Sequence, residues 1–341
     1  MSIEFVRATC ISSMAILALG ALGCGTQPIT LGEGEGAATS EAVGSEQQAL
    51  GTTSNVYVSD GSSTMYVKSL EGGAVKAAVL SEPIGADGVT RKRLGLPQYE
   101  PVTISVPASG TASFFDWAGL ALRRNASVKD VVANYCDANA KQVFTRAFMD
   151  STITALTFGP YDVSSKASSA LFKETITPTS TLTASGDGSA CKGSVGGGKA
   201  NFVGSNFTLE LGQLDTTGVT RIDEIRVVSG VVRAALDPRE IDTRQISISN
   251  FRVFIAERKV DSWHTWFNDF VVDRRSQQEE LQGTITLTAA DGSPLLTISL
   301  KGVGISRLAN TSSDVPGNEL PAGTWVADLY AEELSLSRPA R

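Results

Sequence analysis

The sequence of 341 residues predicts a mainly β (α+β) fold in two tandem copies, each with several strands and one amphipathic helix. Two observations predict it. Glycine is abundant, and Val, Ile, Thr and Ser are spread along the chain, a mix that favours strands and turns over helices. In addition, the same succession of strand-like and helix-like patterns occurs twice along the chain. We therefore expect a duplicated domain in which a helix packs against a sheet.

Each copy shows an alternating strand followed by an amphipathic helix. In the first copy the strand has apolar residues at every second position: Val102, Ile104 and Val106. The apolar face of the following helix is Phe114, Trp117, Ala118, Ala121 and Leu122. The matching residues of the second copy are Phe251, Val253 and Ile255, then Trp263, Trp266, Phe267, Phe270 and Val271. Strand and helix are both displaced by 149 residues, which predicts a duplication.

A hairpin and a closing strand continue the repeat. The two hairpin turns are expected at Asp137–Lys141 and Ala290–Pro294, where Asp291 and Gly292 form a strong turn signal. We align the closing strands as Leu171–Glu174 with Leu329–Glu332. An earlier pair of similar segments is Gly73–Ala78 and Gly230–Ala235.

The first 53 residues predict export and membrane attachment. Ile11–Leu22 is an apolar run that is too short for a bilayer span but fits a signal peptide at residues 1–23. The sequence Ala-Leu-Gly before Cys24 is similar to a bacterial lipobox, so we expect a lipid on Cys24. Residues 24–53 then form a flexible tether. Because Gly25 is not Asp, the outer membrane is favoured. Ordinary secretion with an incidental cysteine is the alternative, since Ala21 stands where a lipobox usually carries Leu.

The predicted body has two domains, residues 54–178 and 206–337. Residues 179–205 between them are rich in Gly and Ser, which predicts a linker. Within it, Gly193, Gly198 and Lys199 have the spacing of a phosphate-binding loop. Ala200 stands where that loop needs a hydroxyl group for magnesium, and no apolar strand precedes Gly193. We therefore interpret this segment as a linker and expect no cofactor.

Two cysteines remain in the predicted body, Cys136 and Cys191. In an oxidising compartment an even remainder favours a disulfide, with two free thiols as the alternative. A metal site is disfavoured because these cysteines and the single histidine lack ligand spacing.

The remaining polar residues predict no active site. His264 is interpreted as a helix residue without a catalytic partner. Asp328, Glu332 and Glu333 are interpreted as the solvent face of an edge strand. Trp117 and Trp266 are expected in the core under each helix. The net charge of −7 disfavours a nucleic-acid partner, since no basic stripe could neutralise phosphates. The sequence thus predicts no enzyme and no catalytic, cofactor-binding or metal-binding residue.

The order of the motifs resembles a known family. The segment Gly95–Ile104, the helix with Phe114 and Trp117, the hairpin and the closing strand are similar to the tail-tube proteins of contractile phages. The tube protein of type VI secretion, the hemolysin-coregulated protein, has a similar build. The resemblance covers roughly residues 55–177 and, more weakly, 206–337, where Asp242–Arg244 replaces the glycine-tyrosine turn.

This resemblance implies a β-barrel or sandwich with a flanking helix, no catalysis, and assembly into six-membered rings. A chain with two copies would complete such a ring as a trimer with pseudo-hexameric symmetry. The lipid anchor departs from the family pattern. We expect a lipid-anchored structural or assembly protein of the cell envelope. The alternatives are a monomer whose sheet edges are covered internally, or a surface adhesin or glycan-binding β-sandwich, which rows of exposed aromatic residues would favour.

Overall fold

The computed structural model describes residues 55–83, 88–125, 127–167, 169–191, 202–233, 241–274, 280–310 and 323–339. The signal segment, Cys24 and the tether lie outside the described residues, as do residues 192–201 with the glycine run. Within the described ranges, no helix is both long and apolar enough to cross a bilayer.

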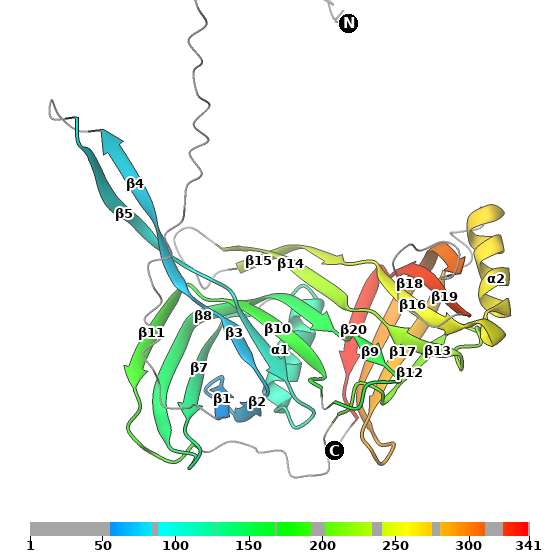
Figure 1. The fold of residues 1–341 in the computed structure, drawn as a ribbon, viewed down its shortest axis with the longest axis horizontal. Helices are drawn as coiled ribbons and strands as arrows, with labels where there is room; N and C mark the ends of the chain where they lie inside the picture. Colours follow the sequence, from blue (N-terminus) through cyan, green and yellow to red (C-terminus); the bar gives the residue numbers. More distant parts are fainter. Residues whose placement is uncertain are drawn as a thin grey trace, which may run out of the picture. The chain divides into compact units, whose positions relative to one another are not determined.

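The first copy consists of strands β1 to β11 and helix α1 (Figure 1). Its strands are β1 Asn55–Ser59, β2 Thr64–Val67, β3 Leu70–Gly72, β4 Val75–Pro83, β5 Thr90–Tyr99, β6 Val102–Val106, β7 Lys129–Cys136, β8 Gln142–Phe158, β9 Tyr161–Asp162, β10 Phe172–Thr177 and β11 Ser180–Ser185. Helix α1 spans Ala112–Leu122, between β6 and β7.

The second copy consists of strands β12 to β20 and helix α2. Its strands are β12 Phe207–Leu211, β13 Val219–Ile222, β14 Ile225–Arg233, β15 Ile241–Ile248, β16 Phe251–Ala256, β17 Leu281–Thr288, β18 Pro294–Asn310, β19 Thr324–Tyr330 and β20 Glu333–Ser337. Helix α2 spans Asp261–Phe267, between the 3-10 turn η1 (Glu257–Lys259) and the π-helical turn η2 (Asn268–Val272). The predicted mainly β, α+β fold is confirmed.

Strand pairing in the second copy repeats that in the first. The first sheet runs β1-β7-β8-β10-β6-β3 and the second runs β12-β17-β18-β19-β16-β13, with every pair antiparallel. The two last strands also correspond, since β11 pairs with β8 and β20 pairs with β18. The two ribbons β4–β5 and β14–β15 occupy the same place in chain order. The repeat in the sequence is therefore a repeat of topology.

The closing strands are displaced from the alignment expected from the sequence. Ile176 pairs with Val102 and Leu329 pairs with Phe251, so Ile176 corresponds to Leu329. Phe172 therefore corresponds to Trp325, and the alignment of Leu171–Glu174 with Leu329–Glu332 is wrong. The similarity came from two apolar pairs, Leu171-Phe172 and Leu329-Tyr330. The first lies at the start of β10 and the second at the end of β19, so they occupy opposite ends of their strands.

The early segments are displaced in the same way. Val75 pairs with Tyr99 and Val227 pairs with Ile248. Tyr99 and Ile248 each stand three residues before the next strand, so Val75 corresponds to Val227, and the alignment of Gly73–Ala78 with Gly230–Ala235 is wrong. Runs of glycine and small residues resemble one another in many registers, whereas cross-strand hydrogen bonding selects one.

The predicted linker contains a strand. Ser180–Ser185 forms β11, which pairs with β8 from Ser180–Met149 to Ser185–Phe144. The boundary at residue 178 therefore cuts off the last strand of the first copy. The strand was missed because Leu182 is its only large apolar side chain, and that side chain is exposed. This strand is held by backbone hydrogen bonds to β8, and such bonds produce no periodic pattern of apolar residues in the sequence.

Each helix places its tryptophans in the core. Trp117 is 1% exposed and Trp266 is 5% exposed, which confirms the interpretation of both as core residues. The core continues from one copy into the other. The Tyr161 ring of β9 lies 6.0 Å from that of Phe202 and 5.8 Å from that of Phe207. The two sheets therefore share one hydrophobic core.

Candidate assembly interface

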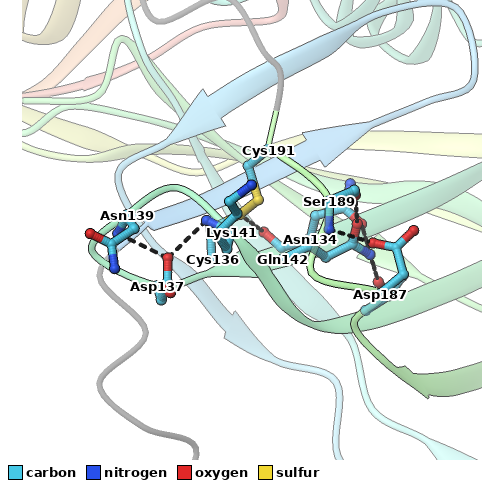
Figure 2. Close-up of a disulfide and its surroundings, with 10 residues drawn as sticks. Asn134, Cys136, Asp137, Asn139, Lys141, Gln142, Asp187, Ser189 and Cys191 are labelled. Carbon is cyan, nitrogen blue, oxygen red and sulfur yellow. Dashed lines mark hydrogen bonds between the residues drawn. A yellow bond between two sulfur atoms is a disulfide. The ribbon is translucent and has the colours of Figure 1, made fainter.

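The cysteines left in the body are joined. Figure 2 shows the disulfide between Cys136, the last residue of β7, and Cys191. Lys141 forms an isolated bridge with Ala190, and the Asp137 carboxylate accepts a backbone hydrogen bond from Lys141 at 2.8 Å. This cross-link ties the segment after β11 to the β7–β8 hairpin. Its surroundings are turns and edge pairing, so it is a structural staple.

A serine, a lysine and an aspartate meet at the start of α1. The Lys129 Nζ lies 2.5 Å from the Asp60 carboxylate and 3.2 Å from the Ser113 Oγ, which itself donates to Asp60. Burial alone raises the pKa of Asp60, but hydrogen bonds from Lys129, Ser113 and Ser62 outweigh it and hold that pKa well below its usual value. Lys129 Nζ donates to the Asp60 carboxylate, to the Ser113 carbonyl and to Ser113 Oγ, so it is not placed to accept the serine proton as an activating base would. The cluster therefore fastens the β1–β2 turn to the helix.

The second copy has the same kind of fastening. Ser262 stands 149 residues after Ser113, and its Oγ accepts from the Asp215 backbone N–H at 3.1 Å. Lys259 Nζ donates to the Asp215 carboxylate at 2.8 Å, and this hydrogen bond together with those from Thr217 lowers the pKa of Asp215 to about 2. Because a serine, a lysine and an aspartate tie the first loop to the helix in both copies, we interpret both clusters as structural.

One carboxyl group is buried in the first core without a partner. Glu174 on β10 is 0% exposed, and neither of its carboxyl oxygens has a hydrogen-bond partner among the described residues. Burial raises its pKa well above the usual value, a rise that Lys129 opposes and Asp60 assists. Ala327 occupies the corresponding position of β19, so this acid belongs to one copy only.

The other polar residues singled out from the sequence lie apart. The His264 ring stands edge-on to the ring of Trp325 at 4.4 Å. Asp328 lies on β19 between β16 and β18, so its interpretation as an edge-strand residue is wrong. Its carboxylate lies 3.8 Å from Arg307, whereas Glu332 and Glu333 are exposed. In the described part of the chain, no three His, Cys, Asp or Glu residues gather as metal ligands.

A shallow cavity of about 350 Å³ opens where the copies meet, and three of its charged residues pair with one another. It is lined by Pro160, Arg221, Asp223, Glu224, Asn250, Phe251 and Arg252. Asp223 accepts from Arg221 Nε at 2.9 Å and from Arg252 Nε at 2.7 Å. The lining contains no nucleophile beside a base, so it gives no catalytic site.

The feature that distinguishes the two copies is the use of their ribbons. In the second copy, β14 pairs with β8 of the first copy, from Ile225–Phe158 to Val228–Ala155. A residual cavity of only about 10 Å³ marks the packing of this ribbon against β8 and α1; it is lined by Ala121, Leu122, Ile153, Ala155, Leu156, Val227, Ser229 and Ile246. One copy therefore extends the sheet of the other within the chain.

The corresponding ribbon of the first copy has no such partner. Among the described strands, β4 and β5 pair only with each other, and Figure 1 shows them extending from the remaining strands. Its exposed aliphatic side chains are Val75 (50%), Val79 (53%), Leu80 (41%), Val89 (54%), Leu94 (68%) and Leu96 (87%). An isolated two-stranded hairpin is marginal in water, and exposed strands with aliphatic side chains are typical of an interaction surface. Sequence reasoning missed this surface because the pattern of both ribbons is similar.

Neither a protein-family model nor a curated protein matches the sequence. Among solved structures, the tube-terminating cap of the anti-feeding prophage is similar over 39% of this chain and 90% of its own, with 18% identity and a TM-score of 0.35. The sheath/tube terminator of the extracellular contractile injection system PVC matches over 39% and 96%, with 19% identity and a TM-score of 0.35. The PVC sheath-tube complex matches over 38% and 88%, with 19% identity and a TM-score of 0.33.

Proposed function

We propose that this chain is a non-enzymatic assembly protein, exported and held at a membrane by a lipid on Cys24, whose folded body closes into a ring of three chains. The observation that carries the proposal is the unequal use of the two ribbons. The β14–β15 ribbon completes a junction between copies inside the chain, and the β4–β5 ribbon is left to make the same junction outside it.

A head-to-tail junction of this kind produces either a closed ring or an open filament, depending on the rotation between neighbours. Ring closure leaves no ribbon unpaired, and paired edges remove the aggregation hazard of exposed strands. With two similar units per chain, three chains supply six units. The membrane anchor and tether would hold such a ring at a surface, and this part of the proposal rests on the lipobox-like sequence before Cys24.

The alternative of a glycan-binding module has less support. Sugar-binding surfaces commonly present aromatic rings, whereas the large hydrophobic side chains that are exposed in the described residues are all aliphatic. The clusters around Asp60 and Asp215 fasten loops and leave no activated nucleophile. Assembly therefore accounts for the exposed residues better than sugar binding or hydrolysis.

The test is the mass of the tag-free body, residues 54–341, measured by sedimentation at micromolar concentrations. We expect a species of three times the mass of one body that dissociates on dilution. A body that stays at the mass of one chain at every concentration would contradict the ring. An indefinite series of larger species would replace the ring with a filament built from the same junction.

A further inference from the structure

We infer that the β4–β5 ribbon of one chain pairs with Gly304–Asn310 of β18 in a second copy of the chain, in the register used inside the chain by β14 and β8. This inference rests on the proposed function and specifies the partner, the surface and the register of that assembly. Three features of the molecule support it: an open strand, a fixed register, and exposed apolar residues on both sides of the inferred contact.

The open strand is the second half of β18. On one side of β8, strand β10 pairs from Phe158 to Thr152 and strand β11 then pairs from Met149 to Phe144. On the other side, β7 reaches Ser151 and β14 then takes over from Ala155 to Phe158. In β18, strands β19 and β20 occupy the first side, and β17 reaches Val303 on the second. Beyond Val303, no strand of the described chain pairs with that second side.

The register follows from residues that correspond in the two copies. Phe158 pairs with Phe172 and Asn310 pairs with Trp325, so Phe158 corresponds to Asn310. Each long strand carries an irregularity at the same place, at Thr154 in β8 and at Ser306 in β18.

On the ribbon side, Val75 corresponds to Val227, which pairs with Leu156. Leu156 stands two residues before Phe158, so its counterpart is Leu308. The inferred pairing between chains therefore places Val75 opposite Leu308.

Side chains that are buried at the β14–β8 junction inside the chain have exposed counterparts at the inferred junction between chains. Val227 is 3% exposed in the junction inside the chain, whereas Val75 is 50% exposed. Leu122 of α1 lines the small cavity under the β14–β15 ribbon, whereas its counterpart Val271 is 37% exposed and the neighbouring Val272 is 62% exposed. Aliphatic residues are thus uncovered on both sides of the missing contact.

A second contact between the copies, that of β20 with α1, also has a counterpart that is not formed within the chain. Inside the chain, β20 of the second copy contacts α1, and the Arg338 guanidinium lies 4.0 Å over the Phe115 ring. The counterpart of β20 is β11, which carries Leu182 at 61% exposure. In the assembled state β11 would face α2 and η2 of the next chain, where Val271 and Val272 are exposed. Two independent seams therefore identify a second copy of this chain as the occupant.

The charges at the inferred seam are already paired within each chain. The register brings Lys76 opposite Arg307, which would be unfavourable for bare charges. Lys76 lies 3.0 Å from the Glu100 carboxylate, and Arg307 lies 3.8 Å from that of Asp328. Lys76 and Arg307 are therefore each paired with a carboxylate of their own chain, which reduces the repulsion between them.

The test is cross-linking of the soluble body through introduced cysteines. Directly opposed residues of antiparallel strands have Cα atoms about 5 Å apart, which is within the range of a disulfide. We expect a mixture of V75C and L308C bodies to form a covalent dimer on mild oxidation. The control pairs L308C with L96C, because Leu96 is more exposed but lies on β5, one strand farther from the inferred partner.

The possible results separate the inference from the proposed function. A cross-link for V75C with L308C but not for L96C supports the pairing. A body that assembles without that cross-link overturns the inferred surface and leaves the ring standing. A body that neither assembles nor cross-links overturns both. Equal cross-linking of both pairs would indicate random collision and would also overturn the pairing.

A substitution without cysteine chemistry checks the same surface. Val75→Lys should weaken self-association at least tenfold, because it places a charge where the seam is apolar. Val75 is half exposed, so the body should fold unchanged, which the thermal midpoint verifies. Val163→Lys is the matched control, since Val163 is 52% exposed and lies outside the inferred seam. Equal association of the two variants would contradict the inference.

Discussion

Replacing Cys191 with serine should destabilise the folded body by about 4 kcal/mol. The disulfide joins residues 55 positions apart, and in the chain-entropy model a cross-link of that span stabilises the fold by about 4 kcal/mol through the unfolded chain. Cys191 is the better position to change because it is partly exposed, whereas Cys136 is 0% exposed. Strand β11 pairs only with β8 in the described chain, so the segment that the disulfide anchors should also loosen.

The assay is urea unfolding of the dilute body, followed by tryptophan fluorescence, because Trp117 and Trp263 are buried. Reduction of the wild type should reproduce most of the effect of Cys191→Ser. Ser189→Ala is the control: it removes the 3.1 Å hydrogen bond from Ser189 to Gln142 and the side-chain hydrogen bond from Ser189 to Asp187, both exposed, and should cost much less than loss of the disulfide. If Cys191→Ser costs no more than Ser189→Ala and reduction changes nothing, the two thiols do not stabilise the body as a pair.

Three further predictions concern the anchor, the buried acid and the junction. Cys24→Ser should move the full-length protein from the membrane fraction to the soluble fraction and stop lipid labelling; a wild type that carries no lipid would contradict the anchor. Glu174→Gln should stabilise the body increasingly as the pH rises above about 4.5. There the unfolded wild type loses a proton that the folded state keeps, at a cost of up to about 1.4 kcal/mol per pH unit; parallel stability curves would contradict the raised pKa. In dilute solution Val227→Ala should cost about 2 kcal/mol and Val75→Ala well under 1 kcal/mol, because only the first side chain is buried; equal losses in urea unfolding would contradict the asymmetry of the ribbons.

Local patterns in the sequence were sufficient for the paired elements of the duplication. The alternation from Val102 and from Phe251 matches β6 and β16, and the helical faces match α1 and α2. The exception is the end of the second face: α2 ends at Phe267, so Phe270 and Val271 lie in η2, and Val271 is exposed. These elements each bury one face, and a buried face leaves a periodic apolar pattern in the sequence. The disulfide partners followed from counting cysteines. Export, lipidation and the tether depend on residues 1–53, and they stay predictions.

Tertiary structure decided the register of the strands, the burial of Glu174 and the roles of the two ribbons. Strand β11 could not be predicted from apolar periodicity, because backbone pairing with β8 holds it. Glu174 occupies an ordinary position in an alternating strand, and its burial depends on residues far away in the sequence that close over β10. The similar ribbons β4–β5 and β14–β15 differ because only the second finds an open strand within its own chain. Pairing depends on which strand edges folding brings together, and a local pattern contains no information about that choice.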